Sequence, residues 1–457
     1  MIEQAQRRRR RRWPLIVGAL VVVVVVAIVG AVGWWFTDGA EYWARSRWQP
    51  PKEALLSSMR VHPIPGWNMN VADLGLPSGS TIARGNETSG IRGPIIETPD
   101  HRAVLLASSP GPTAPQWWLA GVDVDDGHVL FRPVALSVTA IAPSCFANGP
   151  SVVCISDDEQ AATAWVIEAQ TGHVTYTGPT ELRLHGSKLQ AAQVGGYVVV
   201  AADGQGIYGV GPNAETTWFA PGMGKVFKQG GDTAVQGSAR GSYAIELISV
   251  EDGKVITPAL PDGTHLEDVN FFQGGFAAIV VAGKEPPAAQ FFNDAEKPTS
   301  DGRVHGLLGG TAGNLTAVLE DRDHVGIYGP SADKLLDVGG ERPNGMQLIG
   351  TTLWVGETSV VDAAHFQSYD LRTGEKGKPC AFDAANGYLG TDGSVFVRAP
   401  LNQKSDDLAM AYDLATCDMV WSIPRTAGSS GDVTRIGDTI VQLSDDGTEL
   451  MSLVAPS

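Results

Sequence analysis

The sequence predicts an all-β protein: an eight-bladed β-propeller preceded by a single N-terminal transmembrane helix, with seven blades as the alternative. Three observations support this fold class. Glycine provides 55 of the 457 residues, which indicates many turns. Beyond residue 67, short β-branched and aromatic runs alternate with Gly, Asp, Asn and Pro, as they do in all-β proteins. A unit of about 40 to 45 residues also recurs, which is the size of one propeller blade.

Charge is distributed unevenly along the chain. Arg7–Arg12 are six of the 33 basic residues and Glu3 is one of the 50 acidic residues, so the chain from Thr37 onward carries a net charge of −22. A surface of this sign repels a phosphate backbone, and the sequence therefore predicts no nucleic-acid partner. It favours a basic protein partner instead.

Residues 15–36 form an apolar segment of 22 residues without a charge. A helix of this length rises roughly 33 Å and can cross the hydrocarbon core of a bilayer. Trp13 precedes the segment, and Trp34 and Trp35 close it, which places indole rings at both membrane interfaces. The arginines hold residues 1–14 in the cytoplasm as an Arg-rich tail. We therefore expect a single-pass protein of the cell (inner) membrane whose C-terminal domain is extracytoplasmic.

A cleaved signal peptide is the alternative interpretation, since it would begin with the same basic residues. The apolar stretch of a signal peptide is usually about 7–15 residues long and ends at an A-x-A-like site. The stretch in this chain is longer, and no such site follows it. The sequence therefore favours an uncleaved anchor.

Residues 37–66 are predicted to form a juxtamembrane neck. A Pro-Pro pair at 50–51 interrupts the chain, and residues 52–59 could form a helix of two turns. Three aromatic residues that suit the headgroup layer of a membrane lie in the first half of this neck: Tyr42, Trp43 and Trp48.

The propeller is predicted to occupy residues 67–457. Each unit contains an apolar strand, a short polar turn and a second strand. Four of these turns end in glycine, at Gly127, Gly172, Gly253 and Gly374, and Cys417 takes the glycine position in another. Related units lie at 207–218 and 325–336, and an eroded unit covers 262–306. These units account for the predicted eight blades.

The ring of blades has to be closed by its ends. One four-stranded blade cannot bury both of its faces, whereas a ring of blades buries every inner face. The last unit ends without a fourth strand. We therefore expect a strand near 67–74 to pair with the C-terminal strands at 433–455.

Four cysteines lie beyond the predicted span, in an oxidising compartment, and predict two disulfides. Cys145 and Cys154 flank an Asn-Gly turn, a strong hairpin signal that lets them face each other across two strands. Cys380 ends one repeat and Cys417 lies in the turn of the next. We predict the pairs Cys145–Cys154 and Cys380–Cys417, with the other two connectivities as alternatives. Clustered ligands such as C-x₂-C pairs do not occur, so no zinc site is predicted.

Two motifs look like ligand-binding loops but are interpreted as turns. Gly204, Gly206 and Gly209 match G-x-G-x-x-G, but a strand follows them where a dinucleotide site needs a helix. Residues 123–127 look like a calcium loop, but their spacing is wrong and Val134 stands where a bidentate Glu is needed. We therefore predict neither a cofactor nor a metal.

The turns at the C-terminal end carry a family resemblance. The pattern D-x-x-T-G-x-x-x-W, in residues 370–374 and in residues 413–416 with Trp421, resembles the pyrroloquinoline-quinone-like repeat of quinoprotein-alcohol-dehydrogenase-like propellers. The resemblance implies a propeller fold. The arginines before the apolar segment add the expectation of a membrane-anchored protein of bacterial type. Enzymes of that family characteristically pair adjacent cysteines above the cofactor and hold calcium. This chain has no adjacent Cys-Cys, so no catalytic residue is carried over.

The leading functional hypothesis is a non-catalytic propeller that binds or scaffolds another protein of the cell envelope. The alternatives are a quinone-dependent dehydrogenase-like enzyme that uses pyrroloquinoline quinone, and a sensor of a small ligand. Residues 285–303 interrupt the repeat, and Phe291 and Phe292 within them are the candidate partner contact. The other interpretation of this segment is an inter-strand loop with one of these phenylalanines tucked into the blade.

Overall fold

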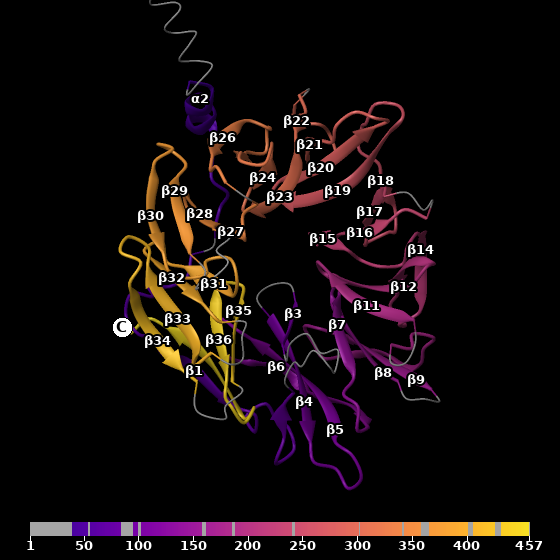
Figure 1. The fold of residues 1–457 in the computed structure, drawn as a ribbon. Coiled ribbons are helices and arrows are strands. Elements are labelled where there is room, and N and C mark those ends of the chain that lie inside the picture. Colours follow the sequence, from indigo (N-terminus) through magenta and orange to yellow (C-terminus); the bar gives the residue numbers. More distant parts are fainter. Residues whose placement is uncertain are drawn as a thin grey trace, which may run out of the picture.

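The strands in the computed structural model form nine sheets arranged as a closed ring (Figure 1). The structure describes residues 39–456, except for 54, 84–94, 99–101, 158–160, 185–187, 240–242, 301, 341, 358–364, 401–404 and 426–430. Every ladder is antiparallel, and each sheet forms one blade. In blades 2 to 8 the first strand lies toward the centre of the ring and the fourth lies at the rim.

The first four blades follow one another along the chain. Blade 1 contains β2 (Thr81–Ile82), β3 (Ile95–Thr98), β4 (Arg102–Ser109), β5 (Gln116–Asp123) and β6 (Val129–Val138). Blade 2 contains β7 (Ser144–Asn148), β8 (Ser151–Asp157), β9 (Ala162–Glu168) and β10 (Val174–Pro179). Blade 3 contains β11 (Leu189–Val194), β12 (Tyr197–Ala202), β13 (Gly206–Val210) and β14 (Thr216–Pro221). Blade 4 contains β15 (Lys228–Gly230), β16 (Thr233–Gly237), β17 (Ile245–Ser249) and β18 (Val255–Ile256).

The remaining blades complete the ring. Blade 5 contains β19 (Thr264–Phe272), β20 (Gly275–Ala282), β21 (Ala288–Asn293) and β22 (Val304–His305). Blade 6 contains β23 (Leu307–Ala312), β24 (Leu315–Leu319), β25 (Val325–Tyr328) and β26 (Lys334–Asp337). Blade 7 contains β27 (Met346–Ile349), β28 (Thr352–Gly356), β29 (Phe366–Asp370) and β30 (Lys376–Cys380). Blade 8 contains β31 (Tyr388–Thr391), β32 (Val395–Arg398), β33 (Asp407–Asp413) and β34 (Met419–Pro424). Blade 9 contains β35 (Asp432–Ile436), β36 (Thr439–Leu443), β37 (Glu449–Val454) and β1 (Ile64–Asn70).

The predicted blade number, eight or alternatively seven, is therefore wrong. The physical reason lies in how blade 9 is built. Blades 1 to 8 each have a turn between their third and fourth strands, and the sequence repeat counts these turns. The third strand of blade 9 is β37 and its fourth strand is β1, which come from opposite ends of the described chain. No turn joins them, so the ninth blade leaves no such signal in the sequence.

The eight turns share one backbone feature, a residue in the left-handed region. Glycine provides it in blades 1, 2, 4 and 7, at Gly127, Gly172, Gly253 and Gly374. Ala214, Glu296, Ala332 and Cys417 provide it in the other four blades, with φ between 54° and 68°. These four are the non-glycine residues with positive φ in the described part of the chain. Because a non-glycine residue is disfavoured in this region, the fold imposes the turn even where the sequence has lost the glycine.

Three of the four turn glycines, those of blades 1, 2 and 4, also receive an aromatic ring from the preceding blade. A Cβ added at Gly172 would lie 2.4 Å from the Phe131 ring, and one added at Gly253 would lie 2.5 Å from the Trp218 ring. Phe131 and Trp218 lie on the outermost strands of blades 1 and 3. The absent side chain thus makes room for a close contact between neighbouring blades.

The hydrophobic core lies between blades rather than within them. One cluster combines Leu105 and Ala120 of blade 1 with Val441 and Leu450 of blade 9. Blades 1 and 2 share another cluster, and blades 6 and 7 share a third. Each blade therefore depends on its neighbours to cover its faces.

The ring closes between the two ends of the described chain, as predicted. Strand β1 pairs with β37 from Ile64↔Val454 to Asn70↔Glu449. Trp67 of β1 then reaches blade 1, where its Nε1 donates a hydrogen bond to the Val124 carbonyl at 2.9 Å. The same ring covers Gly127, at which a Cβ would lie 2.7 Å from Trp67. Trp67 thus joins the outermost strand of blade 9 to the turn of blade 1.

The neck differs from its prediction. Helix α2 spans Ala40–Arg47, and no helix occurs at the described positions of 52–59. Residues 48–53 and 55–63 form a strap along blades 6 to 9. Trp48, Leu56 and Met59 within it are buried. Trp48 therefore packs against the propeller and is not available to a headgroup layer.

The predicted span at 15–36, with Trp13, Trp34 and Trp35, lies outside the described residues. Among the residues that the structure does describe, no helix is long and apolar enough to cross a membrane.

Trp67→Ala is expected to lower the free energy of unfolding by about 3 kcal/mol, because it removes both the ring that covers Gly127 and the hydrogen bond that joins blades 9 and 1. Denaturant unfolding measures this change. Tyr243→Ala is the control, since Tyr243 is 90% exposed and its removal should change the stability by less than about 0.5 kcal/mol. Equal effects of the two substitutions would contradict a closing role for Trp67.

Candidate functional site

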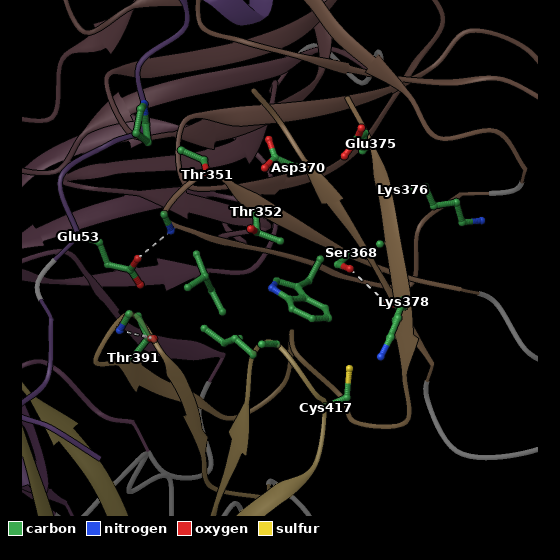
Figure 2. Close-up of a pocket in the computed structure, with 18 of the residues that line it drawn as sticks. Glu53, Thr351, Thr352, Ser368, Asp370, Glu375, Lys376, Lys378, Thr391 and Cys417 are labelled. Carbon is green, nitrogen blue, oxygen red and sulfur yellow. Dashed lines mark hydrogen bonds between the residues drawn. The ribbon is translucent and has the colours of Figure 1, made fainter. Parts of the chain in front are cut away.

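A cleft of about 790 Å³ lies between blades 7 and 8 (Figure 2). Blade 7 contributes residues from all four of its strands to the lining. Blade 8 contributes the end of β31, the turn between β31 and β32, and the turn before β34. The third side is formed by Pro50, Pro51, Glu53 and Leu55 of the strap. The strap therefore completes the cleft between these two blades.

The lining combines apolar groups with hydroxyl groups. Thr351, Thr352 and Ser368 lie on the side of blade 7. The Ser368 hydroxyl donates to the Lys378 carbonyl at 3.2 Å and ties β29 to β30. Trp354 also lines the cleft, although only 2% of its surface is exposed. Among the described residues, its indole N–H has no hydrogen-bond acceptor.

Charges of both signs surround the cleft. Figure 2 shows Glu53 on one side of the cleft and Lys378 on the other, with Asp370 and Glu375 at the upper edge of the view and Lys376 extending outward. The Asp370 carboxylate accepts the backbone N–H groups of the turn that follows it, at 2.6 and 3.0 Å, and is therefore engaged within its own blade. Both lysines belong to exposed positions of β30. The cleft is therefore bordered by three carboxylates and, on the side of β30, by two ammonium groups.

Hydrogen bonds to blade 8 hold the strap in place. The Leu56 N–H donates to the Thr391 carbonyl at 2.8 Å, and the Met59 N–H donates to Asp392 Oδ2 at 2.7 Å. Trp421 donates its indole N–H to the Met59 carbonyl at 2.7 Å. Trp421 lies on the outermost strand of blade 8, where Phe131 and Trp218 lie in blades 1 and 3. Those two rings pack on a turn of the next blade. Blade 9 has no such turn, and Trp421 contacts the strap instead.

Contacts with the strap shift the pKa values of two groups of blade 8, Tyr388 and Asp392. Burial, and then the hydrogen bond that its hydroxyl donates to Glu53, raise the pKa of Tyr388 far above its usual value. Burial opposes ionisation of Asp392, but the N–H groups of Met59, Ser394 and Val395 hold the pKa of this carboxyl below its usual value. Asp392 is therefore a charged acceptor for the strap at neutral pH.

Both predicted disulfides are present. Cys145 and Cys154 lie directly opposite each other on β7 and β8. Cys380 and Cys417 join the outermost strand of blade 7 to the turn of blade 8, and Cys417 lines the cleft. The second disulfide thus holds the two walls of the cleft together at one end. In blades 2 and 4 the same contact, between the turn and the outermost strand of the preceding blade, is made by an aromatic ring over glycine.

Phe291 and Phe292 do not form an exposed contact in this structure. Both lie on β21 and are fully buried. Phe292 stacks on Phe276 with ring centroids 4.8 Å apart, and Phe291 packs near Phe272 and Tyr328. The alternative interpretation, an inter-strand loop with one phenylalanine tucked into the blade, is therefore right about the burial but not about the loop, because both phenylalanines lie on a strand of blade 5.

The two loop-like motifs are turns, as interpreted from the sequence. Gly204 lies in the hairpin between β12 and β13. Near residues 123–127, Asp123, Asp126 and His128 bring ligand atoms within 4.8 Å of one another. His128 Nδ1 lies 2.6 Å from Asp126 Oδ1, so these exposed groups already interact within the turn.

A second cleft, of about 550 Å³, lies between blades 4 and 5. Its lining includes phenylalanines and glycines with Asp294 and Glu296, and none of the described lining residues is a lysine or an arginine. Thr233 begins β16 here, as Thr352 begins β28 in the first cleft. The two clefts therefore offer a comparison at equivalent positions of two blades.

The cleft between blades 7 and 8 was not predicted from the sequence. Its lining comes from separate stretches of the chain, and the strap that completes it looked like a spacer. The Pro-Pro pair followed by Glu53 and Leu55 was the only signal. It could have been interpreted as an extended segment that packs on the propeller.

The comparisons with known proteins agree with nine blades. A family model described as the conjugation-associated 9-bladed beta-propeller domain matches residues 40–456. The match begins at the first residue of α2 and so includes the helix and the strap. An uncharacterized protein of Mycolicibacterium smegmatis (strain MKD8) is 36% identical over 444 residues, which cover 92% of this chain and 91% of that protein.

Solved structures with a similar arrangement are more distant in sequence. BamB from Moraxella catarrhalis is 13% identical with a TM-score of 0.34, and the match covers 86% of this chain and 98% of BamB. The C-terminal WD40 domain of Sif2 is 11% identical with a TM-score of 0.37, and the match covers 87% of this chain and 99% of that domain.

Asp392→Asn is expected to lower the free energy of unfolding by about 1 kcal/mol at pH 7. The carboxylate accepts the Met59 N–H with one oxygen and the N–H groups of Ser394 and Val395 with the other, whereas an Asn side chain has only one acceptor oxygen. A carboxyl whose pKa is lower in the folded state stabilises the fold above its unfolded pKa, and this contribution is lost as the pH falls through the folded value. The difference between variant and wild type should therefore shrink as the pH falls below about 4.

Urea unfolding at pH 7 and at low pH measures this difference. Asp203→Asn is the control, since Asp203 is an exposed carboxylate in the turn between β12 and β13. A difference for Asp392→Asn that stays constant with pH would show that its charge does not hold the strap.

Proposed function

Because the chain belongs to the family of conjugation-associated nine-bladed β-propeller domains, we propose that it is a non-catalytic binding module that holds a protein partner in a conjugation-associated assembly. The proposed module is tethered to the cell membrane by residues 15–36 and lies on the extracytoplasmic side. Its partner is a protein of the cell envelope.

The cleft between blades 7 and 8 is the observation that carries this proposal. Its volume of about 790 Å³ lies in the range of ligand-binding pockets. Apolar groups such as Leu55 and Leu414, hydroxyl groups and charges of both signs lie along one groove. This mixture suits an extended protein segment, whose backbone and alternate side chains need all three kinds of contact. A peptide carbonyl could also supply the acceptor that the Trp354 indole lacks.

Charge supports a basic partner. The chain from Thr37 onward carries a net charge of −22, and such a surface attracts a basic protein over distances of about one Debye length. The long-range attraction and the mixed charges of the cleft have different roles. The first raises the rate of association, and the second fixes the register of the bound segment.

The tether is proposed from the sequence. Six arginines precede 22 uncharged residues, a pattern that keeps the N-terminus in the cytoplasm. Two disulfides in the propeller support an oxidising compartment for that domain. The turns at 370–374 and 413–417 support assigning the repeats to the pyrroloquinoline-quinone-like type in a bacterial protein, because each carries a left-handed residue after the shared D-x-x-T pattern.

Thr352→Trp is expected to abolish capture of the partner, because a bulky ring at the start of β28 fills the cleft without changing any charge. Crosslinking in cells followed by affinity purification of the tagged full chain measures capture, and we expect at least a tenfold loss of the crosslinked adduct. Thr233→Trp is the matched control, since it fills the cleft between blades 4 and 5 at the equivalent position. Loss of the adduct in the control alone, at unchanged melting temperature, would place the partner elsewhere.

The proposed location predicts that protease added to spheroplasts digests the propeller or its strap. It also predicts that a thiol label finds no reactive cysteine until a reductant is added, because all four cysteines are paired. Protection from protease together with four reactive thiols would place the propeller in the cytoplasm.

A further inference from the structure

Helix α2 is fixed to the rim of blade 6 (Figure 1). Ala44 and Trp48 are buried in the cluster that also contains Leu335 and Leu336 of β26, the outermost strand of that blade. Arg45 Nη1 donates to the Leu335 carbonyl at 2.7 Å and lies beneath the helix. The helix therefore continues the propeller and is not a separate spacer.

A second set of contacts fixes the end of the helix. Arg372 donates to the Trp48 carbonyl at 2.7 Å, and its guanidinium lies 5.5 Å from the centroid of the Trp48 ring. Asn314 accepts the Trp48 indole N–H at 3.2 Å and donates to the Gln49 carbonyl at 3.0 Å. Residues of blades 6 and 7 thus hold the C-terminal end of α2, so the direction of the helix is set by the ring.

The other side of α2 presents two aromatic residues to solvent. Tyr42 is 54% exposed and Trp43 is 49% exposed, although both belong to a helix whose neighbouring residues are packed on the blade. Tyrosine and tryptophan are the side chains that concentrate at membrane–water interfaces, because they combine an apolar ring with a polar group. An exposed pair on a docked helix suits a bilayer surface.

The chain itself limits how far this helix can lie from a membrane. The proposed span ends at Phe36 and α2 begins at Ala40. Four residue steps reach at most about 14 Å, even when fully extended. The headgroup region extends only about 5–8 Å beyond the hydrocarbon core on each side. The first turn of helix α2, which contains Tyr42 and Trp43, therefore has to lie in or just above the headgroup layer.

We propose that Tyr42 and Trp43 insert into the headgroup layer, so that the ring stands on its edge with blade 6 against the membrane and blade 1 directed away from it. This inference rests on the tether proposed above. Figure 1 shows α2 beside blade 6, with β4 and β5 of blade 1 across the ring. Both faces of the ring, and the cleft between blades 7 and 8, then stay open to a partner.

Electrostatics favours this orientation. A membrane with anionic lipids repels the acidic propeller, so contact through one edge costs less than contact through a whole face. The charges near the contact are neutralised locally. Glu41 pairs with Arg45 at 3.3 Å, and Arg47 lies 3.7 Å from Asp333.

Site-specific photocrosslinking to lipid tests the orientation. The full chain is reconstituted into phosphatidylcholine–phosphatidylglycerol vesicles with p-benzoylphenylalanine at position 42, 43 or 138. Val138 is the matched control, because it is 55% exposed, as Tyr42 is, and lies on the outermost strand of blade 1. We expect lipid adducts at positions 42 and 43 to exceed those at position 138 at least tenfold, with unchanged melting temperatures for all three proteins.

The failures of the two proposals are distinguishable. Release of the chain from the vesicles by alkaline carbonate would overturn the tether, and the orientation with it. A chain that stays in the vesicles but crosslinks equally from positions 43 and 138, or from position 138 alone, would overturn the orientation while leaving the tether standing. A chain that stays in the vesicles but forms no lipid adduct at positions 42 and 43 would also overturn the orientation.

Discussion

Closure of the ring between β1 and β37 is the constraint on which the rest of this structure depends. A propeller blade has no core of its own, because each hydrophobic cluster is shared by two neighbours. If blade 9 lost its outermost strand, both its edge and the core that it shares with blade 1 would be exposed to water. Trp67 adds a second connection, since its ring packs over the turn of blade 1 while its backbone belongs to blade 9.

The strap follows from the same constraint. To reach its place beside β37, the chain that leaves α2 at the rim of blade 6 has to pass blades 7 and 8. Its polar backbone groups find partners on the way, including Thr391, Asp392 and Trp421 of blade 8. The passage covers the junction between blades 7 and 8 and leaves a cleft beneath it. The candidate site is therefore a consequence of how the ring is closed.

Blades 7 and 8 also show how one repeat position serves different purposes. In blades 2 and 4 the turn glycine receives an aromatic ring from the neighbouring blade. In blade 7 a Cβ at Gly374 would lie 2.9 Å from the guanidinium of Arg45, so helix α2 takes the place of the ring. In blade 8 the contact is covalent, between Cys380 and Cys417. At the two blades that form the cleft, an arginine of α2 and a disulfide thus replace the aromatic ring that contacts the turn glycine in blades 2 and 4.

The sequence by itself determined the all-β class, the turn positions, the closure by both ends and the disulfide pairs, because each is written in local spacing and residue type. The fold decided the blade number, since blade 9 has no turn to mark it. The fold also decided that Trp48, Phe291 and Phe292 are buried. The sequence suggested a membrane interface for Trp48 and a partner contact for the two phenylalanines, because the strands that cover them are distant in the chain. The cleft lay beyond sequence reasoning for the same reason: Glu53 and Thr352 are about 300 residues apart, and only packing of the strap brings them together.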